Sequence, residues 1–523
     1  MFWNIISVLV ALTGLAYYFL HRRYSYWKNQ NVPYSKPMPI VGNYGGLIFL
    51  QKHIAHIVVD ICKEFPNEPY IGAFYGTGPT LIVQDPQVIK QITTKDFYYY
   101  NGREISDYTE KEVAFRNVLS AHGDNWKVVR QNLTPIFSSA KMKMMFDLVN
   151  KCALQFEKLL DHETKMSNIV EARLIMARYT MACITSCAFG VDGKTMEDGF
   201  LQNPFKGLGD HVFNQTKFEA FKFIIRTVWP GIFYGFGQKV FPIKFNQFFH
   251  ELITSVFKAR GYKPSDRNDF IDFILSFQEN KHVTGDSLSN LITGEKNKAS
   301  VPVNDEFLVA QCFIFFLAGF ETSATTLSYT VYEFAKNPDV MRRAQKEVDE
   351  YLLKRENKLQ YDSVNELPFL DACIDETLRM YPVTPVLTRE VRADTALPSG
   401  VKLHKGVRIH IPLQRLHYHP KYFPEPEVYR PERFLGEEKR NIVPNTYMPF
   451  GDGPRLCLGQ RFAKMQILSG LVTVLKKFDF ELAPGTPTKP RYVPYTQFPI
   501  PSHPLNVKFT PREGWQSRIY NKN

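Results

Sequence analysis

The stretch PFGDGPRLCLG, residues 449–459, holds one cysteine, Cys457, in a loop rich in glycine and proline. An amphipathic helix is predicted to begin directly after it, near Gln460. Glycines let a backbone approach a flat cofactor closely because they carry no Cβ. A cysteine at a helix N-terminus meets unpaired N–H groups and the positive end of the helix dipole, and both favour the thiolate. Such a thiolate suits an axial ligand of heme iron; the alternative is a structural cysteine beside a turn.

The spacing F-x-x-G-x-x-x-C-x-G is complete in this stretch and resembles the heme-binding signature of the cytochrome P450 family. The resemblance implies that Cys457 is the iron ligand, and that Phe450, Gly451 and Gly459 shape the loop against heme b. Both residues that flank the cysteine are leucines where Asn and Ile are more usual, which leaves the ligand role intact. The expected fold is mainly α with small β-sheets.

A long helix is predicted from about Asp305 to Ala335, with Asn304 as its N-cap and Pro338 just beyond its end. Its centre is apolar almost all round, as expected of a helix that crosses a large core. Strand-like pieces cluster near residues 70–85, 385–412 and 478–510, and helices dominate elsewhere after about residue 110.

The sequence AGFETS, residues 318–323, lies inside this helix. A glycine there costs about 1 kcal/mol relative to alanine, so it calls for a reason. Thr322 can donate to the carbonyl one turn earlier and loosen the helix locally. The pattern resembles the oxygen-activating motif of cytochromes P450, which implies that Ala318 and Gly319 flank bound O2 while Glu321 and Thr322 hold water and relay protons. The alternative is an ordinary Thr/Glu pair on a helix.

Three further residues match a structural element of the family. Glu376 and Arg379 share one helix face among apolar neighbours, which suggests burial, and a buried ion pair needs further polar partners. The later PERF sequence supplies Arg433. By resemblance, these three residues lock the region that carries the cysteine loop and take no part in the chemistry.

The two propionates of heme need hydrogen-bond donors. The sequence WKVVR resembles a family helix whose Trp126 and Arg130 reach a propionate. Arg455, two residues before the cysteine, can form a bidentate fork with a carboxylate. Arg389 matches a third propionate contact. For each arginine, a solvent-exposed side chain is the alternative.

The N-terminus predicts attachment to a membrane. Residues 1–20 are uncharged and mostly apolar, long enough to cross a bilayer core of roughly 30 Å as a helix. A basic, proline-rich linker follows over residues 21–39, and residues 40–523 form one catalytic domain. Basic residues after the apolar run place that domain in the cytosol. Seven cysteines without a disulfide-like framework agree with a reducing compartment. We therefore expect a single-pass protein of the endoplasmic reticulum membrane.

The net charge of +12 and the pI of about 9.1 suit an anionic leaflet and an acidic protein partner. No Lys/Arg stripe interleaved with stacking aromatics is present, so we expect no nucleic-acid binding. The chain also lacks a Gly-rich dinucleotide fingerprint and a flavin module. By resemblance, electrons come from NADPH-cytochrome P450 reductase, with cytochrome b5 as a further partner.

The expected function is a heme-thiolate monooxygenase that inserts one oxygen atom from O2 into lipophilic small molecules. Residues 133–145 look like those of insect microsomal enzymes that clear xenobiotics, such as plant toxins or insecticides. Asn101-Gly102-Arg103 departs from the order common in that group. The alternatives are an endogenous lipid or hormone hydroxylase, a heme-thiolate isomerase or dehydratase, and a non-enzymatic gas sensor or ligand carrier.

Residues 218–249 combine many aromatic residues with lysine and arginine. This composition is compatible with a patch that dips into membrane lipid, where hydrophobic substrates enter. It is equally compatible with helices that pack on the core.

Overall fold

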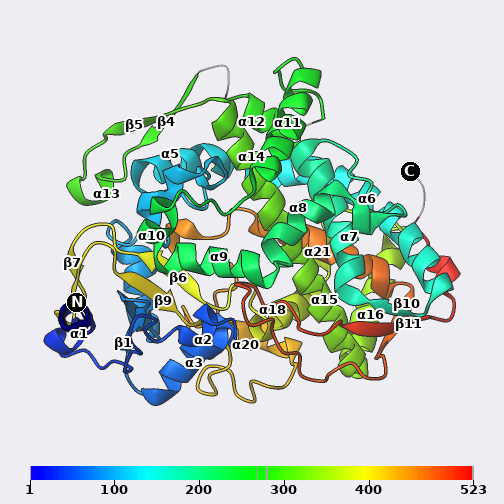
Figure 1. Ribbon diagram of the computed structural model, residues 1–523. Helices are drawn as coiled ribbons and strands as arrows, with labels where there is room; N and C mark the ends of the chain where they lie inside the picture. The colour runs from blue at the N-terminus through cyan, green and yellow to red at the C-terminus, as the bar shows by residue number, and fades with distance from the viewer. Residues whose placement is uncertain (1, 268, 278–280, 521–523) are drawn as a thin grey trace.

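The computed structural model describes residues 2–267, 269–277 and 281–520, and it is mainly helical with small β-sheets, as predicted (Figure 1). The longer helices are α1 (Phe2–Tyr24), α3 (Ile54–Glu64), α5 (Gly123–Leu133), α6 (Ser139–Met166), α7 (Ala172–Ile184), α8 (Pro204–Phe213), α9 (Lys217–Val228), α11 (Ile243–Ala259), α14 (Asp305–Gly319), α15 (Glu321–Lys336), α16 (Pro338–Lys354), α18 (Pro368–Met380) and α21 (Gln460–Leu475). The shorter helices are α2 (Gly45–Ile48), α4 (Pro86–Lys90), α10 (Pro230–Gly235), α12 (Phe270–Leu275), α13 (Asn290–Thr293), α17 (Ser363–Glu366), α19 (Leu413–His417) and α20 (Gly436–Arg440).

The main sheet lies beside α1 and has the strand order β1-β2-β9-β6 (Figure 1). Its strands are β1 (Tyr70–Tyr75), β2 (Gly78–Val83), β9 (Arg408–Ile411) and β6 (Leu387–Glu390), and only the β2–β9 pair is parallel. A second sheet joins β10 (Phe478–Leu482), β11 (Asn506–Pro511) and β3 (Ile169–Glu171). Two further pairs are β4 (His282–Asp286) with β5 (Lys298–Pro302), and β7 (Thr395–Ala396) with β8 (Lys402–Leu403).

The predicted strand regions are confirmed, whereas β3 and the β4–β5 hairpin were not predicted from the sequence. The hairpin is a polar segment with two buried residues in β4 and one in β5. Its sequence therefore lacks the alternation of apolar and polar residues from which a strand is predicted. It packs against α5.

The predicted central helix is confirmed at both ends but is divided in the middle. Asn304 caps α14, since its side-chain oxygen accepts the N–H of Phe307 at 2.8 Å, and α15 ends at Lys336. The two helices are separated at Phe320. Every residue from Phe307 to Leu317 is buried, as an all-round apolar sequence requires.

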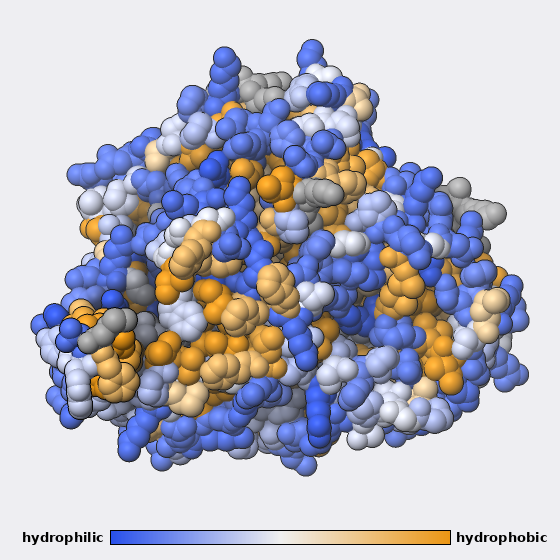
Figure 2. Space-filling view, in the orientation of Figure 1, coloured by the Kyte–Doolittle hydropathy of each residue, from blue (hydrophilic) through white to orange (hydrophobic). Residues whose placement is uncertain are grey.

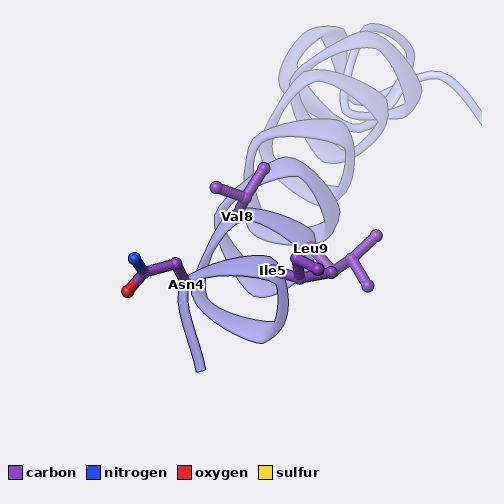
Figure 3. A pocket seen from close by; sticks show the side chains of 4 residues that line it. All are labelled: Asn4, Ile5, Val8 and Leu9. Carbon is purple, nitrogen blue, oxygen red and sulfur yellow. The ribbon is translucent and has the colours of Figure 1, made fainter. Parts of the chain in front are cut away.

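Two helical stretches are long and apolar enough to cross a bilayer. The stretch Asp305–Lys336 is 78% buried in its apolar window and is therefore a core helix. The stretch Phe2–Gln30 has no buried residue in its window. A shallow hollow on α1, lined by Asn4, Ile5, Val8 and Leu9, lies on this exposed helix and is far from any of the predicted chemistry (Figure 3).

The segment after α1 is fixed to the main sheet. Helix α1 continues to Tyr24, four residues beyond the predicted end of the anchor. Trp27 is fully buried, and its indole N–H donates to the carbonyl of Ala73 at 2.9 Å. The N–H of Ser35, within the proline-rich stretch, donates to the carbonyl of Gly72 at 3.1 Å. The linker is thus a docked part of the fold.

Candidate active site

The cysteine loop is closed by its own backbone. The N–H of Cys457 donates to the carbonyl of Phe450 at 2.8 Å, and α21 begins at Gln460 with Gly459 as its N-cap. Gly453 has a φ of +67°, and a Cβ there would lie 2.0 Å from the carbonyl oxygen of Thr93. A side chain at this position would therefore displace the loop.

Cys457 differs from the other cysteines. Six of the seven are buried, whereas the side chain of Cys457 is exposed. Burial nevertheless raises the pKa of its thiol, against the opposing effects of the N–H of Gly459 and the charges of Arg130 and Arg103. The thiol is therefore accessible within a space that the protein encloses. The N–H of Gly459 at the helix N-terminus acts in the predicted direction, but burial outweighs it, and a bound cation would favour the thiolate.

Four arginines lie around this space, and their positive charges repel one another. They are Arg103, Arg130, Arg389 and Arg455. Burial, together with the charge of Arg103, lowers the pKa of Arg389 to about 9. Burial and the charges of Arg103, Arg389 and Arg130 lower the pKa of Arg455. The Nε atoms of Arg103 and Arg389 are buried without a hydrogen-bond partner. Buried cations with unused donors indicate a place for an anion.

Arg130 and Trp126 lie on α5, as the predicted motif requires. Arg130 donates to the carbonyl of Leu456 at 2.7 Å, directly beside the cysteine. Trp126 is 2% exposed, and the guanidinium of Arg455 lies 4.5 Å from the centre of its ring.

The position of Arg455 differs from the expected carboxylate fork. Its guanidinium donates to the carbonyls of Asn101, Val118, Leu119 and Ala121 at 2.5 to 3.4 Å. These bonds use all five of its N–H groups. Arg455 thus holds the 101–121 segment against the cysteine loop, and the other three arginines have the freer donors.

Arg103 was not predicted as a cofactor residue. Gly102 pairs with Glu390 at the end of β6, which brings Arg103 beside Arg389. A Cβ at Gly102 would lie 2.5 Å from the side chain of Arg392, so this close pairing depends on glycine. That glycine was the only local signal in the sequence.

The residues present fit a heme. An exposed thiol faces an internal space, and Arg103, Arg130 and Arg389 supply unused positive charge for two propionates. Among the described residues, no group of three or more His, Cys, Asp or Glu side chains could hold a metal ion. A single thiolate with arginine anchors is the arrangement that heme iron uses and that a zinc site does not.

The central helix opens toward the internal space at the break. Ala318 is exposed, and Gly319 and Thr322 are partly exposed, although residues 307–317 are buried. The hydroxyl of Thr322 donates to the carbonyl of Ala318 at 2.6 Å, as predicted. The missing Cβ of Gly319 faces elsewhere, because it would lie 2.4 Å from Cδ1 of Ile184 on α7. Close packing of α7 against α14 is therefore one reason for a glycine at this position.

Glu321 has a partner that the sequence did not reveal. It is 3% exposed and forms an ion pair with Arg173 of α7, at 2.6 Å. Arg173 donates to Asn214 at 3.0 Å, and Asn214 donates to Asp210 at 2.6 Å. Burial opposes the charge of Arg173, but Glu321 raises its pKa overall. These residues line a cavity of about 60 Å³ between α7, α8 and the helix break.

The predicted structural triad is present. Arg379 donates to both oxygens of Glu376 at 2.7 and 2.8 Å, and both side chains are fully buried. The Nε of Arg433 lies 3.4 Å from Glu376. Arg379 also donates to the carbonyls of His417 and Pro426, each at 2.9 Å. The pair therefore has the additional partners that a buried ion pair needs.

Comparison with known proteins gives the same answer as the geometry. The family model "Cytochrome P450" matches residues 32–509. The chain is a member of the cytochrome P450 family. Cytochrome P450 6B2 of Helicoverpa armigera is 32% identical over 97% of this chain and 98% of its own length. Cytochrome P450 6B5 of Papilio glaucus is 34% identical over 93% of this chain and 99% of its own length. Cytochrome P450 6j1 of Blattella germanica is 31% identical over 93% of each chain.

This cytochrome P450 is similar to insect members of the family, and it is a monooxygenase and hence an oxidoreductase. Family membership implies a heme-iron cofactor with a thiolate ligand, redox partners, O2 and lipophilic substrates. Its N-terminal apolar helix suggests a membrane anchor.

Proposed function

We propose that this enzyme inserts one oxygen atom from O2 into lipophilic xenobiotics such as plant toxins or insecticides. The observation that carries the proposal is the exposed thiol of Cys457 in a buried space ringed by unpaired arginine donors. Heme b, when bound, supplies electron transfer to O2 and oxygen insertion. Cys457 holds its iron, while Arg103, Arg130 and Arg389 bind its propionates.

Thr322 and Glu321 act on protons. The Thr322 hydroxyl, held by the carbonyl of Ala318 at 2.6 Å, keeps its oxygen as an acceptor toward the internal space. Glu321 and Asp210 both line the cavity between α7 and α8, with Arg173 and Asn214 between them. Water in this cavity can exchange protons with Glu321, while Arg173 stays protonated and holds the carboxylate in place.

Electrons come from NADPH through NADPH-cytochrome P450 reductase, with cytochrome b5 as a second donor. The enzyme sits in the endoplasmic reticulum membrane by a single pass, with the catalytic domain in the cytosol. The basic last turn of α1, which holds His21, Arg22 and Arg23, supports this orientation.

Full-length protein reconstituted with reductase in lipid tests the proposal. Product from a lipophilic substrate should require both NADPH and reductase, and the reduced, carbon-monoxide-bound protein should show the red-shifted absorption band of a thiolate-ligated heme. Turnover without reductase would favour the isomerase or dehydratase alternative. Turnover restricted to endogenous lipids or hormones would favour the hydroxylase alternative.

A further inference from the structure

The β4–β5 hairpin contacts one face of α5 along about two helical turns (Figure 1). At the start of α5, the carboxylate of Asp124 accepts the hydroxyl of Ser287 at 3.0 and 3.1 Å and the N–H of Leu288 at 2.6 Å. Near the end of α5, the side-chain N–H of Gln131 donates to the carboxylate of Asp286 at 2.8 Å, and its oxygen accepts the N–H of Asp286 at 2.9 Å. These bonds fix both ends of the helix to the hairpin.

The middle of the contact is a close approach of two backbones. A Cβ at Gly285 would lie 2.7 Å from Oε1 of Gln131 and 3.2 Å from Cα of Val128, so the strand rests directly on the helix. The side chain of Asn132 donates to the carbonyl of Thr284 at 2.9 Å. A glycine inside a strand weakens the strand, and a close approach of another backbone is one reason to have it. The glycine therefore belongs to the contact between β4 and α5.

The other face of α5 carries residues of the candidate active site. Each residue of an α-helix turns the chain by about 100°, so Asp124, Val128 and Gln131 share one face while Trp126 and Arg130 lie on the opposite side. There Arg130 donates to the backbone of the cysteine loop at 2.7 Å, and the ring of Trp126 lies 4.5 Å from a guanidinium of the same loop. The helix is thus held between the hairpin and the cysteine loop.

An apolar contact joins the hairpin to this inner side as well. Leu288 is 4% exposed and forms one buried cluster with Phe97 and Trp126. The rings of Phe97 and Trp126 lie 5.1 Å apart at their centres. The hairpin therefore supports the indole that packs on the cysteine loop.

The hairpin and α5 stabilise each other. The outer surface of the hairpin is mostly hydrophilic, as Figure 2 shows over β4 and β5, and the two strands bury three residues, Val283, Gly285 and Val301. An isolated two-stranded hairpin is marginally stable in water. The contact with α5 is therefore what keeps the hairpin in place.

We infer that the β4–β5 hairpin is a clamp that positions α5 for the cofactor, and that Asp124, Gly285 and Ser287 are positioning residues for heme binding. This inference rests on the proposed contact of Arg130 with a propionate. While the clamp is closed, Arg130 and Trp126 stay against the cysteine loop. When it opens, α5 loses its outer support and withdraws positive charge from the cofactor. The clamp thus sets how long heme stays bound and at which potential it is reduced, without touching it.

Two variants open the clamp from the hairpin side. Ser287→Ala removes the hydroxyl that donates to Asp124. Gly285→Ala adds a Cβ for which α5 leaves no room. The matched control is Ser300→Ala, which removes an exposed hydroxyl from the facing strand β5.

Heme loss is measured on full-length, heme-loaded protein in lipid nanodiscs, as transfer of heme to an excess of heme-free myoglobin. Loss of one buried hydrogen bond predicts about five-fold faster heme loss in Ser287→Ala. The steric overlap in Gly285→Ala should have an effect at least as large. Ser300→Ala should release heme at the rate of the unaltered protein.

The reduction potential is a readout that a general loss of stability would not move. Reduced heme carries one negative charge more than oxidised heme, so a cation beside it favours reduction. Withdrawal of Arg130 should therefore shift the potential of Ser287→Ala and Gly285→Ala to more negative values, measured by spectroelectrochemistry at one pH. The potential of Ser300→Ala should stay unchanged.

Hydrogen exchange shows whether the clamp has opened. In both variants the amides of Asp286 and Leu288, which donate to α5, should exchange faster, while the amides of α15 keep their protection. Faster exchange with native heme loss and native potential would overturn the clamp. Unchanged exchange would overturn it as well, because these contacts would then not hold the hairpin to α5. An effect confined to the affinity for reductase would instead make the hairpin a docking surface and refute the clamp.

Arg130→Gln separates this inference from the proposed function. Fast heme loss in Arg130→Gln, with native heme loss in Ser287→Ala and Gly285→Ala, would overturn the clamp alone. Native heme retention in Arg130→Gln would count against the proposed propionate contact itself.

Discussion

Gly319→Ala tests whether packing or ligand space requires the glycine at the helix break. A Cβ at this position would lie 2.4 Å from Cδ1 and 2.9 Å from Cγ1 of Ile184. Carbon atoms in contact are normally about 3.5–4.0 Å apart, so the overlap is about 1 Å. Overpacking of this kind costs about 1–3 kcal/mol, and alanine returns about 1 kcal/mol of helix propensity. We expect a net loss of up to about 2 kcal/mol in the free energy of unfolding.

The design includes Ile184→Ala and a control glycine. Ile184→Ala alone should cost about 2–5 kcal/mol because it leaves a cavity in the core. In the double variant the new methyl group occupies part of that cavity, so the double variant should be about 1–2 kcal/mol more stable than the sum of the single changes. Gly207→Ala, on α8, meets no atom within 4 Å and should not destabilise the protein.

Urea titrations followed by circular dichroism give the free energies of unfolding. Strictly additive losses in the double variant would refute the packing argument. Coupled turnover of NADPH and substrate supplies the functional readout. If the double variant shows the predicted gain over the sum of the single changes but loses coupling, position 319 must also be kept small on the ligand side.

Three further changes probe the site. Thr322→Ala should raise the release of peroxide per NADPH consumed, measured with reductase present, because it removes the hydroxyl that we propose to take part in proton transfer; unchanged coupling would remove Thr322 from that role. Glu376→Gln leaves Arg379 buried without its counter-charge and should cost about 3–5 kcal/mol, measured as earlier loss of heme absorbance in urea; an unchanged midpoint would contradict the role of the triad. Burial and the charge of Arg379 lower the pKa of His417 from 6.5 to about 3, so the unfolded chain binds the extra proton between these values. Stability should therefore fall as the pH drops from about 6.5 toward 3, by up to about 1.4 kcal/mol per pH unit from this group, and His417→Gln should flatten that slope.

Local chemistry made the cysteine loop, the start of α21, the Asn304 cap and the bond from Thr322 to Ala318 predictable. Each depends on residues within one or two turns of chain. Glu376 and Arg379 were also predictable because they lie on one turn of α18, and only Arg433 comes from a distant segment. The E-x-x-R spacing by itself places the two side chains on the same face of the helix.

The partners that come from distant segments were not predictable. Arg173 pairs with Glu321 across 148 positions in the sequence, and no pattern around either residue announces the other. Arg103 joins the arginine cluster only because the main sheet brings Gly102 to the end of β6. The contact of Gly319 with Ile184 of α7 was likewise not predictable, whereas its place beside bound oxygen stays a prediction. These contacts arise from tertiary packing, and the periodicity of apolar residues along the sequence does not show which helices pack together.

Trp27 fixes the end of the N-terminal helix to the main sheet. Its ring fills the place of a Cβ at Gly72, which would lie 2.4 Å from the indole, and its N–H is bonded to Ala73 in the same strand. Only two residues separate this buried ring from the end of α1 at Tyr24. In the membrane orientation proposed above, a change in the tilt of α1 therefore passes to β1 and to the body of the enzyme through one tryptophan packed against one glycine.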